Sequence, residues 1–174
     1  MGGSSVLHIL VTGMPGVGKT TLVRKITTDL RDLGPVGFYT AEIRERGVRK
    51  GFELASLDGG RGLLSHVDVR SRCRVGKYGV DVEGFDRFLG TIPWFGHDVG
   101  LVVIDEIGKM ECFSRKFQAL IRRILDSDTP VLATVARKGS GLIAEVKQRP
   151  DVELLEMTAD AREVLAGEIV RRFA

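Results

Sequence analysis

Residues 13–20 read Gly13-Met14-Pro15-Gly16-Val17-Gly18-Lys19-Thr20 and match the pattern G-x-x-x-x-G-K-[ST]. Glycines allow backbone angles that turn successive N–H groups toward one point, and such a nest of donors binds an anion. An apolar run over 6–11 precedes the motif, and a helical pattern begins at Lys19. A strand before and a helix after are the context that a phosphate-binding loop requires. The predicted phosphate-binding residues are therefore Gly13, Met14, Pro15, Gly16, Val17, Gly18, Lys19, Thr20 and Thr21.

The end of this loop carries side chains suited to a triphosphate. Lys19 would place a point charge beside the β- and γ-phosphates, and Thr20 offers a hydroxyl ligand for Mg²⁺. The helix that begins at Lys19 adds the positive end of its dipole at the same place. The alternative is a chance match in a chain with 22 glycines among 174 residues, and the flanking strand and helix argue against it.

A second motif follows the apolar run Leu101-Val102-Val103-Ile104, which is typical of a central parallel strand. Asp105 ends the run, as the acid of a Walker B motif does, and we expect it to hold Mg²⁺ through a water. Glu106 could reach an attacking water as a general base, so Lys19 and Glu106 are the predicted catalytic residues. The alternative for Glu106 is a solvated or ion-paired acid at a strand end.

The same acidic residues also fit D-x-x-G, the γ-phosphate sensor of guanine-nucleotide switches, because Gly108 lies three positions after Asp105. In those switches a Gln follows the glycine, whereas here the residue is Lys109. The chain contains no Asn, so it lacks the Asn-Lys-x-Asp motif that reads guanine. We therefore set the switch aside and keep Gly108, with Asp105 and Glu106, among the nucleotide-binding residues.

Charge that develops on a γ-phosphate is usually stabilised by a cation beyond the phosphate loop. The candidates follow the strand over 131–135 or flank a hairpin turn: Arg137, Lys138, Arg44, Arg46, Arg49 and Lys50. For each one a solvated surface position is the alternative, and we expect one or two of the group to touch phosphate. Thr134, near the end of its strand, is a candidate polar sensor.

Other residues that often carry chemistry have ordinary interpretations here. Trp94 could stack on a nucleobase, and the alternative is a loop anchor packed on the core. His8 lies inside an expected strand, which favours a packed histidine over a ligand. Cys73 and Cys112 lie 39 positions apart with no second pair, so no zinc site is expected, and a reducing cytosol fits two isolated cysteines.

The composition describes one globular domain with a mildly basic surface. Hydrophobic residues make up 43% and charged residues 28%, and the formal net charge is +3. This balance suits a phosphate-bearing small ligand and falls short of the clustered basic face that duplex DNA needs.

We expect residues 1–5 to be a flexible leader or tag remnant and 6–174 to form a single domain. No apolar run is long enough to cross a bilayer, so a cytoplasmic monomer is expected. The lack of Asn, with only two Gln, suggests a thermophile.

Strand and helix patterns alternate along the chain, which predicts an α/β fold. Its central sheet should be mostly parallel, with helices on both faces and an antiparallel hairpin at one edge. The expected strands are 6–11, 36–43, 52–57, 101–104, 131–135 and 152–157, with short strands and loops over 59–84. Helices are expected from Lys19 to Leu33, over 113–124 and 142–148, and from Thr158, with a helical turn over 85–89.

Several stretches together resemble the small P-loop nucleoside-triphosphatase family, typified by a thermophile enzyme and by the human cancer-related nucleoside-triphosphatase. They are 12–21, Gly37-Phe38-Tyr39-Thr40, Gly51-Phe52, 73–78 and, most distinctively, the stretch from Val103 to Glu111. The resemblance runs from about Val6 to the C-terminus. It implies a RecA-like P-loop fold and Mg²⁺-dependent hydrolysis of ATP, GTP, CTP and UTP to diphosphate and phosphate. It also implies that the nucleotide site is formed by 13–20 and by the acidic motif around Asp105 and Glu106.

Two other functions stay open. One is a nucleoside or nucleotide kinase, for which Arg137 and Lys138, with the glycine-rich loop over 139–141, would form a short lid. The expected place of Glu106 beside an attacking water argues against a kinase, because kinases exclude water. The other is a nucleotide-regulated module that binds RNA or protein, with RNA phosphates contacting the basic cluster over 70–74. Such a cluster is usually a solvated loop.

Overall fold

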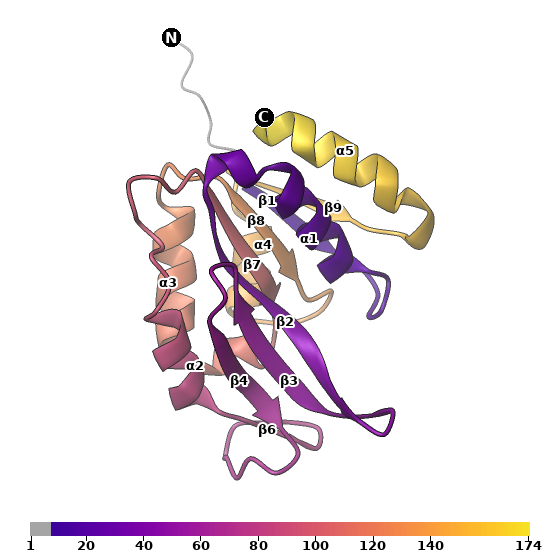
Figure 1. Ribbon diagram of the computed structural model, residues 1–174, viewed down its shortest axis with the longest axis vertical. Helices are drawn as coiled ribbons and strands as arrows, with labels where there is room; N and C mark the ends of the chain where they lie inside the picture. The colour runs from indigo at the N-terminus through magenta and orange to yellow at the C-terminus, as the bar shows by residue number, and fades with distance from the viewer. Residues whose placement is uncertain (1–7) are drawn as a thin grey trace.

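The computed structural model describes residues 8–174, which form a nine-stranded sheet in the order β5-β6-β4-β3-β2-β7-β8-β1-β9 (Figure 1). The parallel half of the sheet consists of β2 (Pro35–Glu45), β7 (Leu101–Ile107), β8 (Val131–Val135), β1 (His8–Thr12) and β9 (Val152–Glu156). Strands β1 and β8 are buried along their whole length, which explains why most of their residues are apolar. The predicted parallel core is confirmed.

The antiparallel half of the sheet extends further than a hairpin. It consists of β3 (Val48–Ser56), β4 (Arg61–His66), β6 (Tyr78–Val80) and β5 (Arg74–Val75). Strand β2 joins the two halves, because it pairs in parallel with β7 and in antiparallel with β3. The turn between β2 and β3 is formed by Arg46 and Gly47, both with positive φ, as a two-residue hairpin turn requires.

Helices cover both faces of the sheet, as predicted (Figure 1). One face is covered by α1 (Lys19–Asp29) and α5 (Arg162–Phe173), and the other by α2 (Val82–Leu89), α3 (Arg115–Leu125) and α4 (Leu142–Lys147). Side chains alternate along β7, so that Val103 packs with α1 and α5 whereas Ile104 packs with α2 and α3. Each face therefore has its own hydrophobic cluster. None of the helices in residues 8–174 combines the length and apolar character that a membrane crossing needs.

The main differences from the predicted elements occur at their ends. Residues 1–5 and the first two positions of the expected strand over 6–11 lie outside the described residues. Thr158 does not cap the last helix: a 3₁₀ turn, Ala159–Ala161, intervenes, and α5 begins at Arg162 with no side-chain cap. Phe113 is not on the buried face of α3, since it lies in a 3₁₀ turn, Glu111–Phe113, and is half-exposed.

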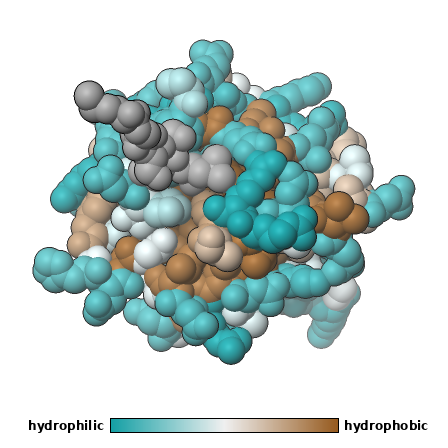
Figure 2. Space-filling model, turned by 90° about the horizontal axis from the view of Figure 1, so that it is seen from above, coloured by the Kyte–Doolittle hydropathy of each residue, from teal (hydrophilic) through white to brown (hydrophobic). Residues whose placement is uncertain are grey.

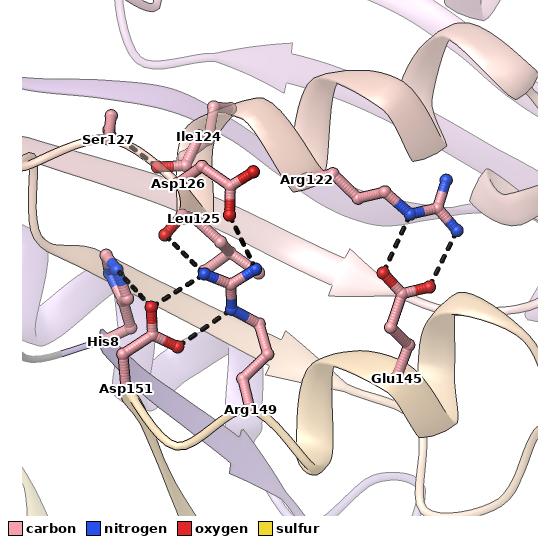
Figure 3. Close-up of polar contacts among 9 residues, drawn as sticks. All are labelled: His8, Arg122, Ile124, Leu125, Asp126, Ser127, Glu145, Arg149 and Asp151. Atoms are coloured by element: carbon pink, nitrogen blue, oxygen red, sulfur yellow. Dashed lines mark hydrogen bonds and ion pairs between the residues drawn. The ribbon is translucent and has the colours of Figure 1, made fainter.

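The end of the molecule where the parallel strands begin is held by an ionic network around Arg149 (Figure 3). The guanidinium donates to both carboxylate oxygens of Asp151 at 2.9 and 2.7 Å, to Asp126 at 2.9 Å and to the Leu125 carbonyl at 2.9 Å. His8 is buried beside Asp151, and burial lowers the pKa of its imidazole. Figure 2 views this end from above, where hydrophilic residues form most of the outline and hydrophobic residues lie between them.

Candidate active site

The glycine-rich loop connects the carboxyl end of β1 to the first turn of α1 and borders a cavity of about 660 Å³. Gly16 and Gly18 have φ of 75° and 100°, which L side chains rarely adopt, so glycine is required at these turns. The loop residues that line the cavity are Gly13, Met14, Pro15, Gly16, Gly18, Lys19 and Thr20. Val17 packs instead against the hydrophobic cluster, and Thr21 is exposed on α1 outside the cavity lining. Seven of the nine predicted phosphate-binding residues therefore line the cavity, and Val17 and Thr21 do not.

Two hydroxyl groups hold the buried carboxylate of Asp105. Thr20 Oγ1 donates to Asp105 Oδ2 at 2.8 Å, and Thr134 Oγ1 donates to Asp105 Oδ1 at 2.7 Å. Asp105 is 1% exposed, and its burial raises the pKa of the carboxyl, whereas the two hydroxyl bonds act in the opposite direction. The strand order explains why these three residues are close together. Strand β8 lies between β7 and β1, so Thr134 near its end lies beside Asp105 at the same end of the sheet. Thr134, the candidate polar sensor, therefore contacts Asp105 directly.

The donor set at Thr20 and Asp105 fits Mg²⁺ in its chemistry. Both groups offer hard oxygen atoms, which Mg²⁺ prefers, and Mg²⁺ usually takes one or two protein oxygens together with substrate phosphates and waters. Among residues 8–174 no cluster of three His, Cys, Asp or Glu side chains could hold a metal ion by itself. The two oxygens therefore suit an ion that arrives with a phosphate ligand rather than one caged by protein alone.

Lys19 and Glu106 line the same cavity, Lys19 from the phosphate loop and Glu106 from the end of β7. The Lys19 ammonium donates to the carbonyl oxygens of Gly13 at 2.9 Å and Met14 at 3.1 Å, which keeps it within the loop. Burial and the nearby charge of Asp105 raise the pKa of the Glu106 carboxyl, and Lys19 lowers it. A raised pKa makes the carboxylate a stronger base, which suits proton abstraction.

A second cavity of about 310 Å³ adjoins the first and shares Glu106 with it. Its lining is mostly apolar, with two acids and two lysines among it: Thr40, Phe52, Leu64, Val75, Glu106, Lys109, Met110, Glu111, Ala136 and Lys138. Glu111 is 5% exposed, and burial together with the charge of Glu106 raises its pKa to about 8. Glu111 was not among the predicted site residues, because a single Glu three positions after Gly108 matches no nucleotide-binding pattern by itself.

Gly108 lies between these two acids and lines neither cavity. A Cβ at this position would lie 2.8 Å from Glu106 Oε1 and 2.9 Å from Glu111 Oε2. The site therefore uses Gly108 for close packing of two carboxylates. Gly108 itself lies beside Glu106 and outside the cavity lining, so its place among the nucleotide-binding residues stays a prediction.

The predicted cations divide into those at the cavity and those away from it. Arg137, Lys138 and Arg49 line the phosphate cavity. Arg137 also forms an ion pair with Glu156 at 3.6 Å. Arg44, Arg46 and Lys50 lie outside the cavity lining, and the Arg44 guanidinium is paired with Glu42. In the basic cluster over 70–74, the Arg74 guanidinium donates to the Lys77 carbonyl at 2.8 Å and stabilises the β5–β6 turn.

Trp94 does not reach the cavity. Its side chain is 6% exposed, its Nε1 donates to the Leu89 carbonyl at 2.9 Å, and its ring packs edge-on against Phe38 at 6.3 Å between centroids. The base-stacking hypothesis for Trp94 is therefore wrong, and the loop-anchor alternative is confirmed. The neighbouring Phe95 is half-exposed and packs under the Arg123 guanidinium.

A further residue that the sequence analysis missed is Arg162, at the start of α5. Its Nη1 lies 3.2 Å from the position that a Cβ on Gly18 would take, so the guanidinium lies against the phosphate loop. The loop that leads to α5 is bonded to the end of β1, because the Met157 N–H donates to the Thr12 carbonyl at 2.8 Å. Sequence pattern could not place Arg162 there, since this contact depends on β9 being the neighbour of β1.

Comparison with known proteins gives consistent matches over nearly the whole chain. A family model described as "NTPase" matches residues 8–170. Nucleoside-triphosphatase THEP1 of Thermotoga sp. (strain RQ2) is 41% identical over 165 residues, covering 94% of each chain. The human cancer-related nucleoside-triphosphatase is 40% identical over 181 residues, again covering 94% of each chain. The crystal structure of THEP1 from the hyperthermophile Aquifex aeolicus superposes with a TM-score of 0.83 at 34% identity, covering 96% of this chain and 99% of that one.

Proposed function

The chain belongs to this NTPase family, and we propose that it is an enzyme that hydrolyses nucleoside 5′-triphosphates to diphosphate and phosphate with the help of Mg²⁺. The observation that carries the proposal is the shared cavity. Lys19 and Glu106 both line it, and the bond between Thr20 and Asp105 lies at its edge. The cavity therefore brings together a cation for the phosphates, two oxygen ligands for Mg²⁺ and a base for the attacking water.

Each residue has a distinct part in the reaction. The N–H groups of the glycine-rich loop and the Lys19 ammonium bind the β- and γ-phosphates, and this charge neutralisation lets a nucleophile approach the γ-phosphorus. Thr20 and Asp105 would hold Mg²⁺, which would supply further positive charge to the phosphate oxygens. Glu106 orients a water for in-line attack and accepts its proton, and its raised pKa favours that transfer. Arg137 and Lys138 are the cations available at the cavity to stabilise the charge that develops on the γ-phosphate.

The proposed substrate range covers ATP, GTP, CTP and UTP. Its support is that the phosphate cavity is lined by the glycine-rich loop and by four cations, Lys19, Arg49, Arg137 and Lys138, which bind phosphates of any nucleotide. Trp94, the aromatic residue that could have stacked on a base, is buried elsewhere.

The test is release of phosphate from the four nucleotides with Mg²⁺, by the unaltered protein and by two variants. Lys19→Ala should lose both binding and turnover. Glu106→Gln should keep nucleotide affinity and lose about 10²- to 10⁴-fold in kcat, since it removes the base and keeps the shape. Glu83→Gln, at an exposed position on α2, is the matched control and should be unchanged. Full turnover by Glu106→Gln would remove Glu106 from its role, and tight binding without release by the unaltered protein would contradict hydrolysis.

The second cavity supports a kinase as the second candidate. It shares Glu106 with the phosphate cavity, and its 310 Å³ are near the lower end of the range for small-molecule pockets. The same assay separates the two functions when nucleosides and nucleoside monophosphates are added. Phosphate transfer to one of them, faster than phosphate release, would favour the kinase, and release unaffected by them would favour hydrolysis.

A further inference from the structure

Arg162 presents a guanidinium to the outer side of the phosphate loop. Its Nη1 and Cδ lie 3.2 and 3.8 Å from the position of a Cβ on Gly18, and the Met157 methyl group lies 3.7 Å from the same point. Its neighbour Glu163 is paired with Lys25, which holds the start of α5 beside the second turn of α1. Arg162 is exposed, and within residues 8–174 its guanidinium has no hydrogen-bond or ion-pair partner.

The strand order shows which part of a bound nucleotide this guanidinium would meet. In the order β7-β8-β1-β9, Glu106 at the end of β7 lies on one side of the phosphate loop. Met157, just after β9, and Arg162 lie on the other side. A nucleotide whose γ-phosphate faces Glu106 must extend the opposite way with the rest of its length. Its α-phosphate and nucleoside therefore point toward β9 and α5.

We propose that Arg162 is a substrate-binding residue that contacts the α-phosphate and nucleoside end of the nucleoside triphosphate. The proposal rests on the function proposed above. A guanidinium has five N–H donors in a planar fork, so it pairs with phosphate oxygens and also stacks on the face of a base. Neither contact reads the hydrogen-bonding edge of a base. Arg162 therefore adds affinity for every nucleoside triphosphate without selecting one of them.

The test measures affinity and turnover separately in Arg162→Ala and Arg162→Lys. Arg162→Ala should raise the Kd for both ATP and ADP about tenfold or more, the loss expected for one charge-assisted contact. Its kcat should stay within about twofold, because Arg162 lies on the side of the loop away from Glu106. Arg162→Lys should recover part of the affinity, since it restores the charge without the planar fork. Arg171→Ala, an exposed arginine at the other end of α5, is the matched control and should bind as the unaltered protein does.

Inorganic triphosphate identifies which part of the nucleotide is contacted. If its KM also rises in Arg162→Ala, the contact is with the α-phosphate, and if only the nucleotides are affected, the contact is with the nucleoside. Unchanged ATP and ADP affinity in Arg162→Ala, or an equal loss in Arg171→Ala, would overturn the proposal. Binding of ADP needs no hydrolysis, so an unaltered protein that binds nucleotide without releasing phosphate would contradict the proposed function and leave the Arg162 test valid.

Discussion

The hydroxyl of Thr20 donates to Asp105 over 2.8 Å and connects the first turn of α1 to the end of β7, although 85 positions separate the two residues. Thr134, from the strand between them, holds the other oxygen of the same carboxylate. The buried acid thus has a fixed orientation before any ligand binds. Preorganised groups of this kind need no rearrangement during the reaction.

Thr134→Val should destabilise the fold, because it keeps the shape of the side chain and removes one of two hydroxyl donors from a buried carboxylate. The free energy of unfolding should fall by about 1–3 kcal/mol, the usual cost of an unmet buried hydrogen bond. Urea unfolding measures the change. Thr158→Val, at an exposed threonine with no side-chain cap bond, is the control and should differ by less than about 0.5 kcal/mol. Equal stability of the two variants would mean that the Thr134 bond contributes nothing.

Glu111→Gln should flatten the dependence of stability on pH. Burial raises the pKa of Glu111 from 4.5 to about 8, so between these values the folded protein binds a proton that the unfolded chain releases. The free energy of unfolding should therefore decrease as pH rises through this range. The variant has no carboxyl to ionise, so it should exceed the unaltered protein in stability at pH 8 and match it near pH 5. Urea unfolding at several pH values, with exposed Glu83→Gln as control, measures both slopes, and parallel slopes would contradict the prediction.

Gly108→Ala should reduce turnover more than stability. The added methyl group would lie within 3 Å of the ends of Glu106 and Glu111, and both are flexible side chains that can move away. Displacing the base by about 1 Å can cost as much as a hundredfold in rate, so we expect kcat to fall at least about tenfold with nucleotide affinity retained. Gly90→Ala, where the nearest atom would lie 3.4 Å away, is the matched control. Unchanged kcat in Gly108→Ala would show that Glu106 tolerates the shift.

Arg149→Met should weaken the end of the molecule opposite the active site and leave catalysis intact. The variant loses the paired bonds to Asp151 and those to Asp126 and Leu125, so the free energy of unfolding should fall by about 2 kcal/mol. Arg122→Met is the comparison, because its bidentate pair with Glu145 is more exposed and should cost about 0.5 kcal/mol (Figure 3). Thermal and urea unfolding measure both variants, and equal losses would contradict the argument from burial.

The parallel half of the sheet and the phosphate loop could be predicted because their signals are local. An unbroken apolar run such as 101–104 and a motif such as 13–20 have their meaning within a few residues. The short strands over 59–84 could be predicted only in outline, since two- and three-residue strands are stabilised by their neighbours in the sheet. Thr158 has the chemistry of a helix cap, but a 3₁₀ turn takes that place.

The site residues that the sequence analysis missed are those whose role depends on topology. Glu111 becomes part of the site because the chain turns back at Gly108 and packs the acid beside Glu106. Arg162 reaches the phosphate loop because β9 pairs with β1, a pairing that no local pattern shows. Trp94 shows the converse, since its residue type suggests a ligand contact and its burial excludes one.

The position of β1 in the sheet also determines when the phosphate loop can form during synthesis. Both neighbours of β1, the strands β8 and β9, come more than a hundred residues later in the chain. A nascent chain that has emerged only as far as β7 therefore has the complete motif over 13–20 but neither of the strands that hold β1 in the sheet. Nucleotide binding should arise late in translation, after residue 156 has left the ribosome, and ribosome-bound chains of increasing length would show it as a single step.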